Sequence, residues 1–403
     1  MIGSKKPFVV GTVGFVLLGI ATTIFGVIWP SVAEDLDRSI GELGYVTLAY
    51  GAGYTASSLL SGRLASRWPT GMLLVGAASV ATAALTLLAT APGWTALLIA
   101  TALLGSAGGQ IDAGTNTYVA VRYGSRAMSF LHGAFGVGAI VGPLLITTLF
   151  VFDLSWRVGF AVLASCELLY LLGLWIYARS LTTPAQAQTA QTRSTAGARK
   201  ALFWSVAVFF LYAGMATGLG AWVFTFLTED RGVSETSGGL IVTAYWAGFT
   251  LSRIVLGIIG ERANPSNVLV WSGAATFAAL AVFWMAPTGV VGTLAFVAAG
   301  FAHGPVFPFE MLLTPTRFGD SLTSTVVGYE IAAANVGGAT ISGIIGLLVD
   351  RYGLDVVPGV LLIVALGVWG SIWMLRTTSD RENEPGQGAT APRGHPDRSN
   401  DLR

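Results

Sequence analysis

Charged residues are scarce in this chain of 403 residues. They make up 11% of it, whereas hydrophobic residues make up 53%. A soluble domain carries roughly 25% charged residues, so the composition excludes an ordinary soluble protein. The formal net charge of +1 gives no sign of nucleic acid as a partner. The chain is therefore expected to lie in a lipid bilayer.

Cysteine and reactive motifs are also scarce. Cys166 is the only cysteine, which excludes an intramolecular disulfide. It lies in an apolar run, so we expect a buried, inert thiol. The sequence has no phosphate-binding loop of the Gly-x4-Gly-Lys-Ser/Thr type and no cluster with metal-ligand spacing. We therefore expect no enzyme, no cofactor and no metal site.

Long apolar runs are abundant. A spanning helix needs about 20 such residues. Charge-free runs of this length lie at Pro7–Ala33, Leu43–Gly62, Ala201–Thr228 and Val356–Leu375. Further apolar runs, which hold at most one charge each or are broken by a proline, lie between these four. Together the runs predict an all-α membrane protein of twelve transmembrane helices in two six-helix bundles. The expected division is a first bundle over 1–180, a cytoplasmic linker over 181–200, a second bundle over 201–376 and a disordered cytoplasmic tail over 377–403.

The distribution of Lys and Arg predicts the orientation. Loops on the cytoplasmic side of a membrane collect these residues. With the amino terminus inside, the external loops keep only Arg38, Arg157, Arg231 and Arg351 of the 22 basic residues. The opposite orientation would reverse that ratio. Both termini are therefore expected in the cytoplasm, in a multi-pass protein of the cell (inner) membrane.

An internal repeat supports two equivalent halves. Tyr50-Gly-Ala-Gly-Tyr-Thr-Ala-Ser57 returns 195 positions later as Tyr245-Trp-Ala-Gly-Phe-Thr-Leu-Ser252. The same offset relates Arg122-Tyr-Gly124 to Arg317-Phe-Gly319. A duplication of this size in so apolar a chain is typical of a transporter that moves one half against the other around a midplane site.

These features resemble the major facilitator superfamily. The predicted loops Gly62-Arg-Leu-Ala-Ser-Arg67 and Gly257-Ile-Ile-Gly-Glu-Arg262 are similar to its signature, although the first lacks the acid. Asp112-Ala-Gly-Thr-Asn-Thr-Tyr-Val119 and His132-Gly-Ala-Phe-Gly-Val-Gly-Ala-Ile-Val-Gly-Pro143 resemble helices 4 and 5 of the fucose permease family, and Pro305-Val-Phe-Pro308 and Asn335-Val-Gly-Gly-Ala339 its helices 10 and 11. The resemblance implies proton-coupled import of a neutral sugar. That family's bacterial members also carry an acid in helix 1, which is absent here between Phe8 and Trp29.

Asp112 is the first candidate for proton coupling. A charged carboxylate is costly at membrane depth, so a nearly isolated Asp can take and release a proton as its access alternates. The alternative is a structural Asp satisfied by hydroxyl groups or an Arg nearby. Asn116 lies one turn on, on the same helix face. It is expected to bind a sugar hydroxyl or Asp112, or to join two helices.

Two acids are candidates in the second half. Glu330 either pairs with a basic group near the cytoplasmic end or faces the cavity. Glu310 lies two turns from Arg317, where gating, structural and coupling roles are all open. Glu167 is a weaker candidate, because its helix usually lies outside the cavity in this superfamily, and we expect it to contact a neighbouring helix.

Aromatic and amide side chains are candidates for the sugar site. Sugar rings stack on aromatic faces, and amides and carboxylates fix their hydroxyl groups. The expected substrate-binding residues, in addition to Asn116, are Tyr50, Tyr54, Trp222, Tyr245, Trp246, His303 and Asn335. Trp222 is alternatively a residue of the aromatic belt at the membrane interface.

A further set is assigned gating or structural roles. His132 senses protons, binds substrate or only anchors a helix, and Gly136 and Gly138 allow helices to approach closely. The basic residues of the set are Arg67, Arg122, Arg253, Arg262 and Arg317. Because Arg253 lies nearest to membrane depth and only in the cytoplasmic half, an anionic substrate is disfavoured.

The favoured function is a secondary transporter that imports a sugar with protons, and the protein is expected to act as a monomer. Sodium coupling stays open, because carboxylates and carbonyls suit that ion too. The main alternative is a drug/proton antiporter, which would release protons when substrate binds. A receptor or scaffold has little support, because no appended soluble domain is apparent.

Overall fold

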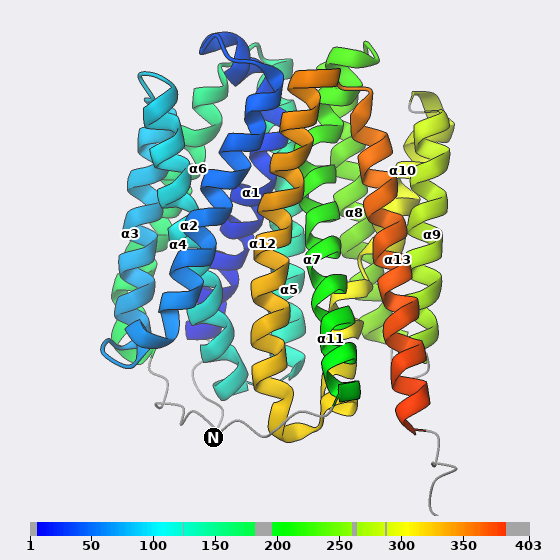
Figure 1. Cartoon of the computed structure of the whole chain (residues 1–403). Coiled ribbons are helices and arrows are strands. Elements are labelled where there is room, and N and C mark those ends of the chain that lie inside the picture. The colour runs from blue at the N-terminus through cyan, green and yellow to red at the C-terminus, as the bar shows by residue number, and fades with distance from the viewer. Residues whose placement is uncertain (1–5, 124, 182–195, 260–263, 287, 384–403) are drawn as a thin grey trace, which may run out of the picture.

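The computed structural model describes residues 6–123, 125–181, 196–259, 264–286 and 288–383, and within these ranges it is helical without strands. The first six long helices are α1 (Lys6–Asp35), α2 (Leu43–Ala65), α3 (Thr70–Ala89), α4 (Trp94–Tyr123), α5 (Ser125–Val151) and α6 (Trp156–Tyr177). The second half holds α7 (Ala196–Thr225), α8 (Glu235–Ile259), α9 (Pro265–Met285), α10 (Gly289–His303), α11 (Val306–Phe318), α12 (Asp320–Tyr352) and α13 (Val356–Asn383). They run roughly parallel along one axis (Figure 1).

The described helices make twelve membrane spans, as predicted. Eleven segments are long and apolar enough to cross a membrane, with α10 and α11 forming one of them. The twelfth is α2, in which Gly, Ser and Thr take many positions that other spans give to Leu, Ile or Val. A less apolar helix is acceptable there because α2 packs against protein, namely α4 and α12.

Helix ends follow local sequence signals. Ser155 caps α6 by accepting a hydrogen bond from the Arg157 amide, and Asn264 caps α9 in the same way from Asn267. The break between α10 and α11 falls at Gly304 and Pro305. Proline lacks the N–H that a continuous helix requires, so one predicted span becomes two helices.

The two halves repeat the same packing. In the first half α2 packs on α4 and α3 on α6; in the second, α8 packs on α10 and α9 on α13. The agreement extends to single residues. A side chain on Gly105 would strike the main chain of Tyr50, and one on Gly300 would strike that of Tyr245. Both pairs are related by the 195-residue offset, which confirms the internal repeat.

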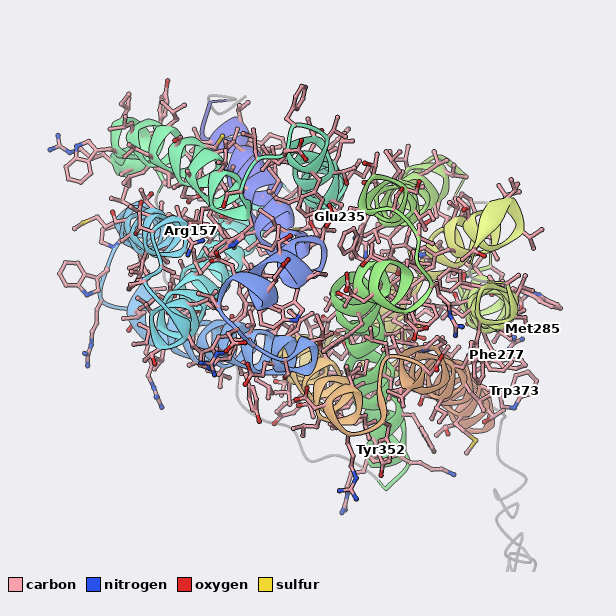
Figure 2. The ribbon with its side chains drawn as sticks, turned by 90° about the horizontal axis from the view of Figure 1, so that it is seen from above. Arg157, Glu235, Phe277, Met285, Tyr352 and Trp373 are labelled. Atoms are coloured by element: carbon pink, nitrogen blue, oxygen red, sulfur yellow. The ribbon has the colours of Figure 1, made fainter. Side chains whose placement is uncertain are left out.

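The halves meet through equivalent helix pairs, α2 with α12 and α5 with α8 (Figure 2). The closest approaches of α2 and α12 lie at the predicted outer end, where Gly44 faces Gly343 and the Gly41 amide donates a hydrogen bond to Asp350 (3.1 Å). Near that end Phe150 also stacks on Phe224 across the halves, 6.1 Å between ring centroids. The structure therefore has its halves joined at the predicted outer end.

The predicted domain limits stay predictions, because most of the linker and tail lies outside the described residues. Within them, α7 already begins at Ala196, and α13 continues to Asn383, beyond the predicted last bundle residue. The start of α1 and the end of α13 lie at the same end of the bundle (Figure 1), which fits the expectation that the termini share one side.

Candidate functional site

Asp112 lies between α4 and α2, about halfway along both helices. Its two carboxylate oxygens accept separate hydrogen bonds, one from the Tyr54 hydroxyl (2.7 Å) and one from the Asn116 amide (2.8 Å). All three side chains are half-buried. Asn116 takes part because residues four apart share a helix face. The group is thus a carboxylate held by two donors and still partly accessible.

Glycines of α4 make the approach of α2 possible. A side chain on Gly108 would touch the Tyr50 hydroxyl and the Tyr54 ring, and one on Gly109 would strike the main chain of Tyr54. The rings of Tyr50 and Tyr54 lie 6.0 Å apart. Small residues at a helix crossing let side chains from the partner helix reach over it. The repeated Tyr segment therefore supplies the side chains beside Asp112.

The second half replaces this acid site by an aromatic and basic one. By the repeat offset, Phe307 stands in the place of Asp112 and Phe249 in that of Tyr54. Arg253 lies over the Phe249 ring (4.2 Å), donates from Nη2 to the Tyr212 hydroxyl (3.1 Å) and donates from Nε to the Gly304 carbonyl (3.1 Å). Its guanidinium is thereby held in a fixed position in a half-buried setting.

His303 and Tyr245 lie behind this arginine and are fully buried. His303 Nδ1 and the Tyr245 hydroxyl are 2.8 Å apart, and the imidazole packs against the Tyr212 ring at 4.3 Å. Trp246 is also buried, edge-on to Tyr245 at 5.2 Å. These predicted substrate residues are thus buried inside the second bundle, whereas Tyr50, Tyr54 and Asn116 keep partly accessible surface.

Glu310 and Glu330 are brought together near the predicted inner end of the second bundle. Glu310 forms a buried ion pair with Arg317. Glu330, fully buried, accepts hydrogen bonds from Ser205 of α7 and from Thr314 of α11, the latter at 3.1 Å. Two acids and one arginine thus share one buried cluster. Ser205 and Thr314 carry no motif, so nothing in the sequence could have identified them.

The remaining predicted residues are spread over the interface. His132 of α5 packs against Phe307 of α11 across the halves (6.4 Å). Gly136 faces Thr250 of α8, and Gly138 faces the main chain of α1. Trp222 is fully buried and donates to Ser342 of α12 (3.0 Å to Oγ), and Asn335 is half-buried.

The predicted signature arginines differ in their surroundings. Arg67 and Arg122 are exposed at the predicted inner end, while Arg317 is buried with Glu310. Arg262 lies outside the described residues. The roles of all these residues stay predictions.

Cys166 and Glu167 are neighbours in α6 with opposite exposure. Cys166 is exposed, so the expected burial of the thiol is wrong. Glu167, one residue on, is only 4% exposed and lies inside the first bundle. α6 is apolar on every side, so its sequence gives no periodicity to show which face turns inward.

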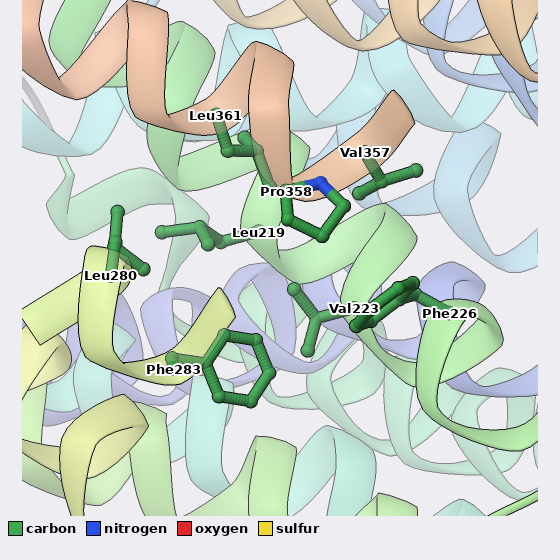
Figure 3. Close-up of a pocket in the computed structure, with 8 residues that line it drawn as sticks. All are labelled: Leu219, Val223, Phe226, Leu280, Phe283, Val357, Pro358 and Leu361. Atoms are coloured by element: carbon green, nitrogen blue, oxygen red, sulfur yellow. The ribbon is translucent and has the colours of Figure 1, made fainter. Parts of the chain in front are cut away.

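A small pocket between α7, α9 and α13 is chemically inert. It is lined by Leu219, Val223, Phe226, Leu280, Phe283, Val357, Pro358 and Leu361 (Figure 3). Its volume is about 10 Å³, which is too small for a sugar. Its lining is apolar, so it has no side chain that could orient a polar ligand. The polar groups at mid-depth therefore carry the candidate site.

Two repeated helical bundles, each with half-buried polar groups inside its spans, are the architecture of a multi-pass membrane transporter. The sequence profile of the Major Facilitator Superfamily matches residues 11–329 and 223–398. The chain belongs to the Major Facilitator Superfamily. Its members are transporters and not enzymes, as predicted.

Individual relatives support the same assignment. The chain is 21% identical over 394 residues to the glucose/mannose transporter GlcP of Bacillus subtilis, covering 94% of this chain and 96% of the relative. It is 25% identical over 393 residues to the sodium-dependent glucose transporter 1A of Mus musculus, covering 84% and 88%. The solved structure of the superfamily transporter FucP in its outward conformation matches with a TM-score of 0.63 at 18% identity, covering 92% of this chain and 98% of that one. The predicted resemblance to the fucose permease family is thus confirmed at the level of fold.

Proposed function

We propose that this protein is a secondary active transporter that imports a neutral sugar together with protons by alternating access. The observation that carries the proposal is the half-buried Asp112 with its donors Tyr54 and Asn116. The two relatives described above, a glucose/mannose transporter and a sodium-dependent glucose transporter, support a sugar as substrate. The orientation with both termini in the cytoplasm and a place in the cell membrane are part of the proposal.

Protonation of Asp112 changes what the site offers to a sugar. As a carboxylate, Asp112 only accepts hydrogen bonds and engages both Tyr54 and Asn116. With a proton, one oxygen becomes a donor, and a donor of the present pair is free to turn to a substrate hydroxyl. The neutral form also avoids the cost of moving a charge when the site changes sides. Proton and sugar binding therefore favour one another.

The ring of a sugar has apolar faces that stack on aromatic side chains. Tyr50 and Tyr54 offer such faces beside Asp112. In the second half, Arg253 and Asn335 are half-buried and carry further donors. The acids Glu310 and Glu330 belong to a buried cluster in which Arg317 is the one basic partner described. Because one arginine balances only one of the two acids, the other can take up a proton in a second coupling role.

The test is transport by the purified protein in liposomes with glucose, mannose, galactose and fucose. An inward pH gradient should drive sugar accumulation, and sugar addition should acidify the lumen. Asp112→Asn should abolish accumulation yet retain exchange of labelled for unlabelled sugar, because the neutral amide imitates the protonated acid. Asp37→Asn is the matched control, since Asp37 is exposed in an outer loop with φ of 51°, which Asn also adopts.

Other outcomes separate the alternatives. If sugar accumulation follows a sodium gradient and does not depend on the pH gradient, the coupling ion is sodium and not the proton. If cationic drugs make the lumen more alkaline and sugars cause no response, the protein is a drug/proton antiporter. Accumulation that survives in Asp112→Asn would remove Asp112 from the coupling step.

A further inference from the structure

Glu167 is an acid inside the first bundle that the proposed transport site does not use. Only 4% of its surface is exposed, and its Oε1 atom is buried without a hydrogen-bond partner. α6 turns Cys166 outward and Glu167 inward. A buried carboxylate without a partner is strongly unfavourable. Glu167 therefore needs a proton, a water molecule or both to be stable there.

A cavity of about 20 Å³ lies beside Glu167, between α1, α2, α3, α4 and α6. Gly14, Tyr50, Gly108 and Glu167 line it together with apolar side chains. A water molecule needs about 10–15 Å³ of such space and two or more polar partners. The Glu167 carboxyl group and the Tyr50 side chain are polar partners on two sides, so the cavity is suited to hold water.

Tyr50 connects this cavity to the proposed transport site. A side chain on Gly108 would lie 3.0 Å from the Tyr50 hydroxyl, so this hydroxyl sits at the cavity wall that Gly108 forms. The Tyr50 ring lies 6.0 Å from the Tyr54 ring, and the Tyr54 hydroxyl donates to Asp112. Asp112, Tyr54, Tyr50 and the cavity beside Glu167 thus lie next to one another in this order inside the first bundle.

The helices around Glu167 bring few other titratable groups. Within the spans, α1 carries none between Phe8 and Ala33, and α3 carries none over Thr70–Ala89. α5 brings Arg126 near its start and His132, whose ring packs edge-on against α1. On α6 itself Tyr170 is the near neighbour. Its hydroxyl, buried without a partner, occupies the place that a side chain on Gly14 would take. Within the part of the chain that the structure describes, Glu167 forms no ion pair with an arginine or lysine.

We propose that Glu167 is a second proton-binding site of the first bundle, linked to Asp112 by a water-filled cavity and the hydroxyl of Tyr50. The inference rests on the proposed coupling at Asp112 and adds a second acid to it. In the transfer, an O–H bond forms at the Glu167 carboxylate and one breaks at the cavity water. That water regains a proton from the Tyr50 hydroxyl, which takes one in turn from the protonated Asp112 carboxyl group by way of the Tyr54 hydroxyl. The water and both tyrosines end unchanged, and the negative charge moves from Glu167 to Asp112.

The test compares infrared difference spectra of the full-length protein in liposomes as pH is changed and as glucose is added. A protonated carboxyl group gives a carbonyl band that shifts in deuterated water. We expect a responsive band that survives in Asp112→Asn and is lost in Glu167→Gln. In transport, Glu167→Gln should lower the number of protons taken up per sugar, and Glu167→Asp should restore part of it. Cys166→Ser, next along the same helix but exposed, is the control and should match the parent.

Tyr50→Phe tests the connection itself. It should slow the response of the Glu167 band to a pH jump, while Tyr45→Phe, on the same helix with an exposed ring, should not. A Glu167 band that never responds to pH or sugar, or an unchanged proton count in Glu167→Gln, overturns the proposal. If Glu167→Gln does not fold, Glu167→Asp and Tyr50→Phe decide the question. A shifted carboxyl band in Glu167→Asp and a slower response in Tyr50→Phe support the proposal, and a response unchanged from the parent in both variants overturns it. The infrared response needs no sugar transport, so a responsive band in a protein that moves no sugar would reject the proposed function alone.

Discussion

The buried ion pair of Glu310 and Arg317 shows that the contribution of an ion pair to stability depends on its surroundings. The two side chains are 1% and 8% exposed, so neither charge is well hydrated. The pair of Asp35 and Arg157 at the predicted outer end has similar chemistry, but its side chains are 43% and 33% exposed. Water and salt screen such a surface pair. The same type of contact is therefore expected to differ in its contribution to stability.

Glu310→Gln should lower the free energy of unfolding by about 3–5 kcal/mol, because it leaves the Arg317 charge buried without its partner. Asp35→Asn should cost about 0–1 kcal/mol. Thermal unfolding of both variants in the same detergent measures the difference. Replacing both members of the buried pair, as in Glu310→Gln with Arg317→Met, should recover part of the loss. Equal melting temperatures for the two single variants would contradict the argument.

At the scale of helices, glycines set how closely α2 approaches α4 and α8 approaches α10. Gly105 and Gly300 lie at equivalent crossings, and each faces the main chain of a tyrosine in the repeated segment. A main-chain atom cannot move aside as the end of a flexible side chain can. Gly76 of α3, by contrast, has open space where a side chain would begin. The two kinds of glycine should respond differently to the same substitution.

Gly105→Ala should destabilise the protein by about 1–3 kcal/mol, the range for overpacking a well-packed interior, and should also weaken sugar binding by displacing Tyr50 and Tyr54. Gly76→Ala should be neutral or stabilise by about 0.5–1 kcal/mol, because alanine favours the helix. Melting temperature and the half-saturating sugar concentration measure the two effects. A Gly105→Ala protein with parental values of both would show that the crossing has room to relax.

The helices were predictable from the sequence, whereas their inward faces were not. Long apolar runs and the 195-residue offset were enough for twelve spans and two halves, since both depend only on composition and order. Asp112 and Asn116 could be paired from their spacing, but Tyr54 as a donor required the α2–α4 crossing. Cys166 and Glu167 show the limit clearly. In a helix that is apolar all round, no periodicity tells which of two neighbours meets lipid.

For the whole molecule, the joined outer ends imply a rearrangement during transport. Alternating access requires the halves to part at one end and close at the other. Here α2 and α12 approach most closely at the predicted outer end, where Leu48 packs against Gly343. These two helices belong to different halves, so their separation opens that end. Holding them together should stop the cycle without disturbing either bundle.

A disulfide between Leu48→Cys and Gly343→Cys should block sugar transport, and a reductant should restore it. The geometry suits the bond, because a Cβ atom at position 343 lies 2.8 Å from Leu48 Cγ, close to where a cysteine sulfur would be. The matched control joins Gly11→Cys to Thr115→Cys, which lie within the first half at 3.0 Å by the same measure. Both pairs are made in a Cys166→Ser background. Because each half moves as a body, the control disulfide should spare transport. Full activity of the oxidised 48–343 protein, with the cross-link confirmed by mass spectrometry, would contradict the parting of α2 from α12.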